Sequence, residues 1–328
     1  MFRIFTVNSP FNIILCAIAF LALQVSWWAQ SQQQVLIVNY TEPLSNLLFT
    51  PIQLLSNSKS ILQSVGFVLA FAIAIWLNAT ITSNKILQSR TYTTAILFLL
   101  LLSLVNNFAT LLPPLMALFF ALRILQKSLT IIKDEKPFGD IFDLGWLSSL
   151  ATLFYFPAIW LFPFSLMALV ILRPFSLREW LMAATGFIAP LFLVFAIYFW
   201  FDKTHELVYN LINLPNTTPF NFSFTASTIV AAITLAVLFL LSTSALPRIL
   251  FSNAIQIRKF SMLLLLMVAL TLLSALFQSS FQIWHFSMLC LPLSILCAMY
   301  FQSLKGIFIS ELLFGMLILS AVFVHFFK

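Results

Sequence analysis

Residues 139–180 form a long apolar stretch that has charged side chains only near its two ends and three prolines inside it. Its first part, 140–155, has 16 residues. As a helix it is about 24 Å long, slightly short of the roughly 30 Å hydrocarbon core of a bilayer. The second part, 156–173, has 18 residues and fits that thickness better. The stretch therefore predicts a proline-broken helical hairpin over 140–173, embedded in a membrane.

Composition extends this prediction to the whole chain. Of 328 residues, 62% are hydrophobic and 8% are charged, and the mean hydropathy is +1.06. One soluble core could not bury so much apolar surface, so lipid must serve as the solvent. The three cysteines, Cys16, Cys290 and Cys297, lie in apolar runs without C-x-x-C spacing. They predict packed thiols rather than a metal site or a disulfide.

We expect residues 1–328 to form a single all-α integral-membrane domain, because the largest loops, near 30 residues, are too short to fold alone. About 11 transmembrane helices are predicted, at 11–28, 61–78, 93–112, 113–125, 140–155, 156–173, 180–201, 226–246, 260–278, 287–301 and 307–326. The fourth is short. If it or the hairpin only dips into the membrane, the count falls by two or the later loops change sides.

Three segments have particular expectations. The first span could be a signal peptide ending at Ala29-Gln30-Ser31, but its apolar region is too long and only Arg3 precedes it. The moderately apolar piece 44–55 is expected to lie along the membrane surface or to dip into it. In the seventh span, Gly186 and Pro190 are expected to loosen the helix.

The distribution of basic residues predicts the orientation. With the amino end in the cytoplasm, 13 of the 16 lysines and arginines fall on the inner side. Most of them lie in the loops 79–91, 126–139, 173–179 and 247–259, and the positive-inside rule favours this arrangement. The same rule explains the net charge of +7 without a nucleic-acid partner. The outer side then contains the loops 29–60 and 202–225 and the carboxyl end.

The predicted outer side carries the residues best suited to catalysis. They are Glu42, Asp202, His205 and Glu206, with His285 near them in the predicted arrangement. A carboxylate here could act as a general base, and two or three such ligands could hold a divalent metal ion on a diphosphate. The alternative is an ordinary wet loop flanked by interfacial aromatic residues. The metal, if any, cannot be named from the sequence.

Other charged residues have simpler interpretations. Asp140 and Asp143 share a face at the start of the hairpin, where they would cap the helix and complement its dipole. Arg173 and Arg178 flank the hairpin's end and are candidates for binding a lipid phosphate or for interface anchoring. Glu311, in the eleventh span, is either a proton-coupling acid that faces the bundle interior or an acid near the helix start.

The start MFRIFTVNSPFN and the block 138–191, with ILRPFSLREW as its most specific part, resemble an uncharacterised family of multi-pass inner-membrane proteins of Bacteroidota-type bacteria. This resemblance covers most of the chain. It implies a bacterial inner membrane location, with the amino end cytoplasmic and the carboxyl end periplasmic, and it implies no activity.

Glu42 followed by LSNLLFTPIQLL is similar in placement to the first outer loop of polyprenyl-dependent GT-C glycosyltransferases. That resemblance implies transfer of a sugar or oligosaccharide from a polyprenyl-linked donor at the outer face. The chain departs from the family by lacking a paired acidic dipeptide on that face, a W-W-D-Y-G sequence and a soluble outer domain.

Three functions follow as hypotheses. The first is the membrane glycosyltransferase, with a polyprenyl-phosphate sugar as partner and Glu42, Asp202, His205 and Glu206 as its site. The second is a transporter or lipid flippase, for which Glu311 and the prolines at 157, 163 and 190 are the supporting features. The third is a non-catalytic subunit that binds other proteins of the cell envelope.

Overall fold

The computed structural model describes residues 11–31, 42–55, 59–87, 91–105, 112–132, 134, 137–205, 207–208, 226–244, 247, 255–276, 283–304 and 307–326. Within these ranges every regular element is a helix, and no strand occurs. The elements are α2 (Phe11–Ser31), α3 (Pro43–Leu55), α4 (Lys59–Ser83), α5 (Thr93–Leu104), α6 (Leu112–Ile131), α7 (Phe138–Phe154), η1 (Phe156–Trp160), α8 (Leu161–Leu172), α9 (Leu177–Trp200), α11 (Ala226–Ser244), α13 (Ile255–Leu276), η2 (Ile283–Phe286), α14 (Ser287–Ser303) and α15 (Ile307–Phe326).

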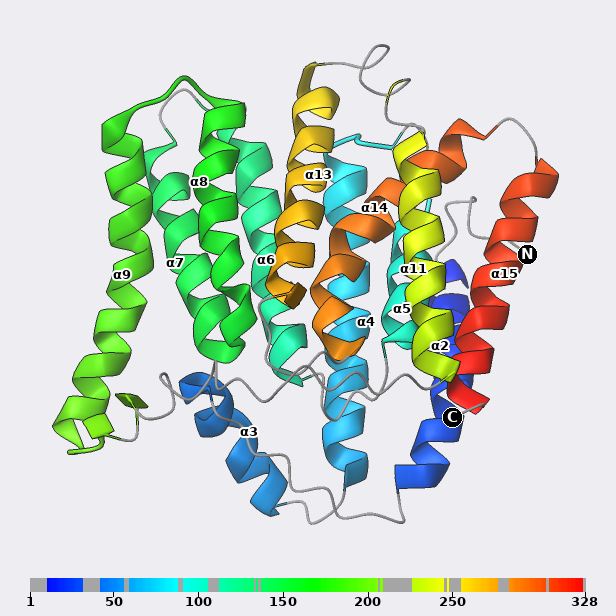
Figure 1. The fold of residues 1–328 in the computed structure, drawn as a ribbon, viewed down its shortest axis with the longest axis horizontal. Coiled ribbons are helices and arrows are strands. Elements are labelled where there is room, and N and C mark those ends of the chain that lie inside the picture. Colours follow the sequence, from blue (N-terminus) through cyan, green and yellow to red (C-terminus); the bar gives the residue numbers. More distant parts are fainter. Residues whose placement is uncertain are drawn as a thin grey trace.

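The long helices lie roughly parallel in one bundle (Figure 1). In that view α4, α6, α8, α11 and α14 run upward, and α5, α7, α9, α13 and α15 run downward. We call the upper end the basic end, because Lys85, Arg173, Arg178, Arg258 and Lys259 lie at or next to helix ends there. Helix α3 lies obliquely across the opposite end, as a segment along a membrane surface would.

Six of the described helices, α4, α6, α9, α11, α13 and α15, are long and apolar enough to cross a membrane. Over their described lengths, α2, α5, α14 and the unit of η1 with α8 are also apolar but shorter. The prediction of an all-α architecture with membrane-spanning character therefore agrees with the described residues. The count of eleven spans stays a prediction.

Several predicted boundaries were wrong. The fourth span was expected over 113–125, but α6 runs from Leu112 to Ile131. It continues past the apolar run because Lys127 and Thr130 bond to the facing helix α7, so Lys127 belongs to a helix and not to a loop. Helix α4 extends to Ser83, past the expected residue 78. Helix α13 begins at Ile255, so Arg258 and Lys259 are also helical and not part of a loop over 247–259. Residues 106–111, near the expected end of the third span, lie outside the described residues.

The centre of the bundle is formed by α5 and α14. Every residue of α5 is buried, and so is nearly all of α14. Helix α9 lies at the edge (Figure 1), where only Glu179, Ala183, Gly186 and Pro190 are buried. A bundle in lipid leaves such apolar edge helices exposed, because the hydrocarbon chains solvate them.

Two glycines let α7 and α9 approach closely. A Cβ atom added to Gly145 would lie 1.9 Å from the carbonyl oxygen of Ala183, and one added to Gly186 would lie 2.3 Å from that of Phe142. Small residues allow such backbone contacts between membrane helices. Gly186 therefore packs α9 tightly rather than loosening it, and α9 continues as a helix through Pro190.

Candidate functional site

Glu42 directly precedes helix α3, at the end of the bundle opposite the basic end. The buried Ser45 donates a 2.5 Å hydrogen bond from Oγ to the carbonyl of Phe154, the last residue of α7. The final carbonyls of a helix lack intrahelical partners, so this bond satisfies one of them and anchors α3. The N–H of Asn46 donates to the carbonyl of Glu42 at 2.9 Å. Half-buried Glu42 is thus three residues before Ser45, whose hydrogen bond to Phe154 fixes the start of α3.

The proline break of the hairpin positions Tyr155. Helix α7 ends at Phe154, Tyr155 is extended with φ −150° and ψ 107°, and η1 begins at Phe156. Pro157 has no N–H, and in an α-helix its ring would clash with the carbonyl four residues earlier. Helix α7 therefore stops here, as the prediction of a broken hairpin required. Tyr155 belongs to neither helix.

Tyr155 pairs with a histidine from a distant part of the chain. Its hydroxyl lies 2.5 Å from Nδ1 of His285 in η2, and both side chains are buried. The negative charge of Glu42 also acts on Tyr155. Which of the two atoms donates the hydrogen bond depends on which ring nitrogen of His285 carries the proton. Glu42, Tyr155 and His285 form what we call the Glu–Tyr–His cluster.

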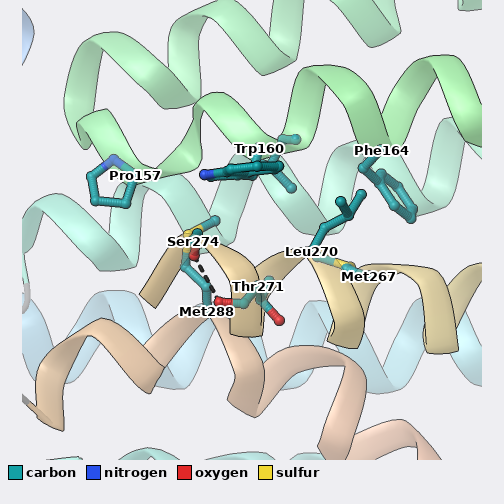
Figure 2. Close-up of a pocket in the computed structure, with 9 residues that line it drawn as sticks. Pro157, Trp160, Phe164, Met267, Leu270, Thr271, Ser274 and Met288 are labelled. Carbon is teal, nitrogen blue, oxygen red and sulfur yellow. Dashed lines mark hydrogen bonds between the residues drawn. The ribbon is translucent and has the colours of Figure 1, made fainter. Parts of the chain in front are cut away.

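An apolar crevice begins beside this cluster (Figure 2). Pro157, Trp160 and Phe164 line one side of it, and Met267 and Met288 line the other. Its cavity volume is about 10 Å³, which is close to the space that one water molecule needs. The same two segments build both features, since Pro157 is two residues after Tyr155 and Met288 is three after His285.

The structure brings only part of the predicted site together. The charge of Glu42 acts on Tyr155, which is bonded to His285. Asp202, with φ 52°, and His205 are exposed beyond the end of α9, and among the described residues neither side chain makes a hydrogen bond or ion pair. Glu206 lies outside the described residues. Within the described part of the chain, no three His, Cys, Asp or Glu side chains are arranged to hold a metal ion.

Sequence reasoning missed Tyr155 as a site residue. In the sequence analysis Tyr155 was only the last residue of the first predicted hairpin helix, 140–155. One signal was present, because a tyrosine two residues before a proline, inside an apolar run, leaves a hydroxyl that needs a partner. That partner is 130 residues away along the chain.

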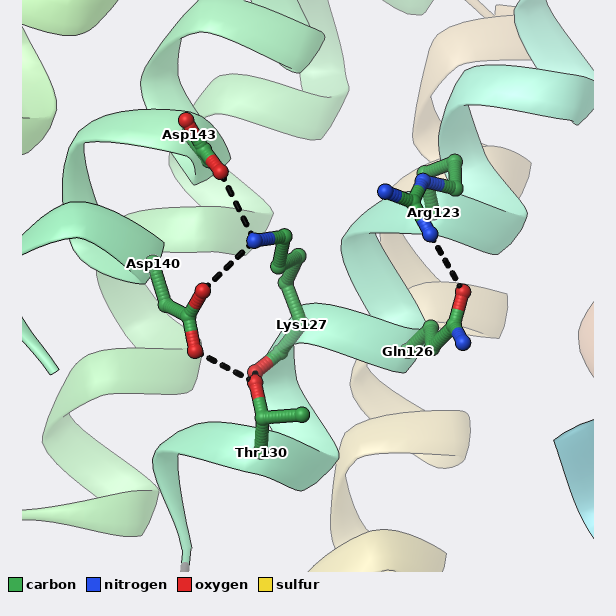
Figure 3. A network of polar contacts seen from close by, with 6 residues as sticks. All are labelled: Arg123, Gln126, Lys127, Thr130, Asp140 and Asp143. Carbon is green, nitrogen blue, oxygen red and sulfur yellow. Dashed lines mark hydrogen bonds and ion pairs between the residues drawn. The ribbon is translucent and has the colours of Figure 1, made fainter. Parts of the chain in front are cut away.

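A second polar network lies near the basic end, between α6 and α7 (Figure 3). Nζ of Lys127 is 2.6 Å from Oδ1 of Asp140 and 2.7 Å from Oδ2 of Asp143. The hydroxyl of Thr130 donates to the other oxygen of Asp140 at 2.6 Å. The interpretation of these acids as caps was incomplete. The residue before α7 is Pro137, which makes no side-chain capping bond, and both acids pair with a lysine on α6.

Arg123 adds a further cation one turn before Lys127. Its guanidinium lies 5.3 Å from the centre of the Trp76 ring, and its Nη1 donates to Gln126 at 2.8 Å. Glu311, which was expected either inside the bundle or near a helix start, is exposed at the fifth residue of α15. That position agrees with the second expectation, an acid near the helix start.

Comparisons with known proteins add no relative. No protein-family model, curated protein or solved structure matches this chain.

Proposed function

We propose that this chain is a membrane enzyme that transfers a sugar from a polyprenyl-linked donor at the end of the bundle where Glu42 lies. The observation that supports this proposal is the Glu–Tyr–His cluster. In it, the charge of half-buried Glu42 acts on buried Tyr155, which is bonded to His285. In this proposal the basic end is cytoplasmic, eleven helices cross the bacterial inner membrane, and the site faces the periplasm.

Glu42 acts as the general base. Its carboxylate takes the proton of an acceptor hydroxyl while that oxygen forms a bond to the anomeric carbon of the sugar. The bond from that carbon to the donor phosphate breaks, and the phosphate leaves with the electron pair. Tyr155 and His285 are positioning residues, because they are buried and bonded to each other. They form a buried polar pair on which the charge of Glu42 acts through Tyr155.

The crevice supports a substrate with an apolar chain. It lies next to the cluster and presents Trp160, Phe164 and two methionines. The hydroxyl groups of Thr271 and Ser274 on its wall donate to carbonyls of their own helix at 3.0 Å and 2.7 Å. The wall is therefore effectively apolar. A divalent ion held mainly by donor phosphate oxygens needs only one or two protein carboxylates. Glu42 could supply one of them, in place of its role as the base.

The test uses the full chain in nanodiscs with radiolabelled polyprenyl-phosphate hexose as the probe and release of the hexose as the readout. Glu42→Gln should lower the rate by about 10²- to 10⁴-fold, the usual contribution of a general base. Asp134→Asn, an exposed acid near the basic end, is the matched control and should keep the wild-type rate. Equal rates for the wild-type protein and Glu42→Gln would refute the proposal.

A further inference from the structure

The two arms of the α7–α8 hairpin are short for membrane helices. Neither arm is among the six described helices that are long and apolar enough to cross a membrane. The stretch from Asp140, which pairs with Lys127 near the basic end, to Tyr155 at the turn is about 24 Å long as a helix. A hydrocarbon core of roughly 30 Å extends about 6 Å beyond that turn. By length alone, the hairpin ends before the side of the membrane opposite the basic end.

Contacts with α9 fix the level of the turn. Helices α7 and α9 run in the same direction (Figure 1), and the guanidinium carbon of Arg178 lies 4.5 Å from the centre of the Phe138 ring at the start of α7. Further along both helices, Gly186 faces the backbone of Phe142. Each residue of α7 thus lies beside an α9 residue that is about 40 positions later in the sequence.

Helix α9 continues past the turn. In this register Tyr155 is level with about residue 195 of α9, which ends at Trp200. The first charged residue after that level is Asp202, seven residues further on. Seven helical residues span about 10 Å. Helix α4, which begins at Lys59, also extends beyond the turn (Figure 1), so two separate helices reach further toward this side than the hairpin does.

The side chains near the turn suit hydrocarbon. No charged residue occurs between positions 144 and 172, and Ile159, beside the turn, is 36% exposed. The end of α9 differs, since Trp200 is 84% exposed and lies two residues before Asp202. An exposed tryptophan beside charged residues is typical of the boundary between hydrocarbon and headgroups. The outer boundary of the membrane thus corresponds to the end of α9 and not to the hairpin turn.

We propose that the α7–α8 hairpin is re-entrant. It enters the membrane from the basic end and turns back inside the outer leaflet, so the Glu–Tyr–His cluster lies about 6–10 Å beneath the outer hydrocarbon boundary. The extended residue Tyr155 is buried in protein, as non-helical backbone at membrane depth has to be. The two hairpin helices then do not cross, and the number of crossing helices in the proposed function falls by two.

The depth of the cluster selects the class of its ligand. Glu42 is three residues before Ser45, which bonds to the carbonyl of Phe154 at the level of the turn. An ionisable residue at membrane depth marks a functional site. A ligand that reaches Glu42 is therefore an amphiphile dissolved in the outer leaflet, and the acceptor hydroxyl of the proposed reaction belongs to such a molecule, as the donor does. This step rests on the proposed function, whereas the depth follows from the helix register whatever the reaction is.

The first test measures the depth of the turn with nitroxide labels on the full chain in nanodiscs. One label is attached at Ile159→Cys and the other at Trp200→Cys, and the wild-type chain, whose cysteines are buried, gives the background signal. Collision rates with oxygen and with a water-soluble nickel chelate report the depth of each label. The label at position 159 should lie deeper by about 6 Å or more. Equal depths would show that the hairpin crosses, and would overturn the proposal.

The second test compares two carbodiimides, which convert a carboxyl group into an N-acylurea that peptide mass spectrometry detects. Glu42 should react at least about tenfold faster with lipid-soluble dicyclohexylcarbodiimide than with a cationic water-soluble carbodiimide, because a cation enters hydrocarbon very unfavourably. Exposed Asp202, on the same side beyond the end of α9, is the matched control and should prefer the water-soluble reagent. Glu42→Gln should remove the label from its peptide.

Equal or faster reaction of Glu42 with the water-soluble carbodiimide would overturn the assignment of an outer-leaflet ligand. Neither test measures hexose release. A chain that passes both tests but transfers no sugar would therefore refute the proposed function and leave the re-entrant hairpin in place.

Discussion

The α7–α8 hairpin has its open end near the basic end and its turn at Tyr155. Polar side chains are arranged differently at these two places. Near the basic end, Lys127 lies within 2.7 Å of two aspartates, so opposite charges meet directly. At the other end, Tyr155 and His285 are buried, and the bond between them joins a hydroxyl to an imidazole. Among the described residues, Glu42 is the acid whose charge acts on Tyr155.

This difference suggests that the first group of residues mainly stabilises the fold and the second mainly serves the reaction. Directly paired charges are fixed in their ionised forms, which suits a contact that joins α6 to α7. An imidazole and a carboxylate can each gain or lose a proton near neutral pH, which suits catalysis. We therefore expect changes near the basic end to alter mainly the free energy of unfolding, and changes at the other end to alter mainly the rate.

The largest expected effect on stability comes from the glycine contact between these two ends. Gly186→Ala forces a Cβ atom to within 2.3 Å of the Phe142 carbonyl oxygen. Overpacking of this kind costs about 1–3 kcal/mol, and a backbone obstacle favours the upper value, about 3 kcal/mol. The measurement is the free energy of unfolding by SDS titration in mixed micelles.

The same variant sharpens the comparison, because α9 contributes Arg178 and Glu179 near the basic end but no residue to the Glu–Tyr–His cluster. Hydrogen exchange should rise along 177–190 and stay low near Tyr155. The control is Gly315→Ala in α15, where an added Cβ meets nothing within 4 Å. It should be neutral or stabilising by up to about 1 kcal/mol. If Gly186→Ala and Gly315→Ala lowered the free energy of unfolding equally, the close contact between α7 and α9 at Gly186 would be contradicted.

The helices were largely predictable from sequence, because their apolar runs are local. Helix α15 spans Ile307–Phe326, the predicted range, and α14 begins at the predicted Ser287. The end of α6 was not predictable, because Lys127 reads as a loop residue until the aspartates of α7 face it. The roles of Tyr155 and Gly186 were not predictable for the same reason, because their partners lie in other helices. Hydropathy identifies a span but not the neighbour that it faces.

The second prediction concerns the charge pairing near the basic end. Lys127→Met leaves Asp140 and Asp143 without their lysine, and the side chains of Lys127 and Asp140 are 21% and 22% exposed. We expect a loss of about 2 kcal/mol in the free energy of unfolding, between the values for exposed and buried pairs. Hexose release by the fully folded fraction should stay at the wild-type rate.

Removing the acids as well separates unpaired charge from lost packing. Lys127→Met combined with Asp140→Asn and Asp143→Asn should recover about half of the lost stability, because no carboxylate then remains without a cation. Lys203→Met, at an exposed site, is the control and should cost under about 0.5 kcal/mol. If the triple variant is less stable than Lys127→Met alone, the aspartates stabilise the protein by some means other than this pairing.

The smallest expected effect on stability is at the turn of the hairpin. Tyr155→Phe removes the hydrogen bond to His285 and should lower the free energy of unfolding by about 1 kcal/mol. The measurement is the same SDS titration in mixed micelles. A variant as stable as the wild-type protein would show that this buried bond does not stabilise the fold, and any loss of rate in that variant would then come from the position of the catalytic groups alone.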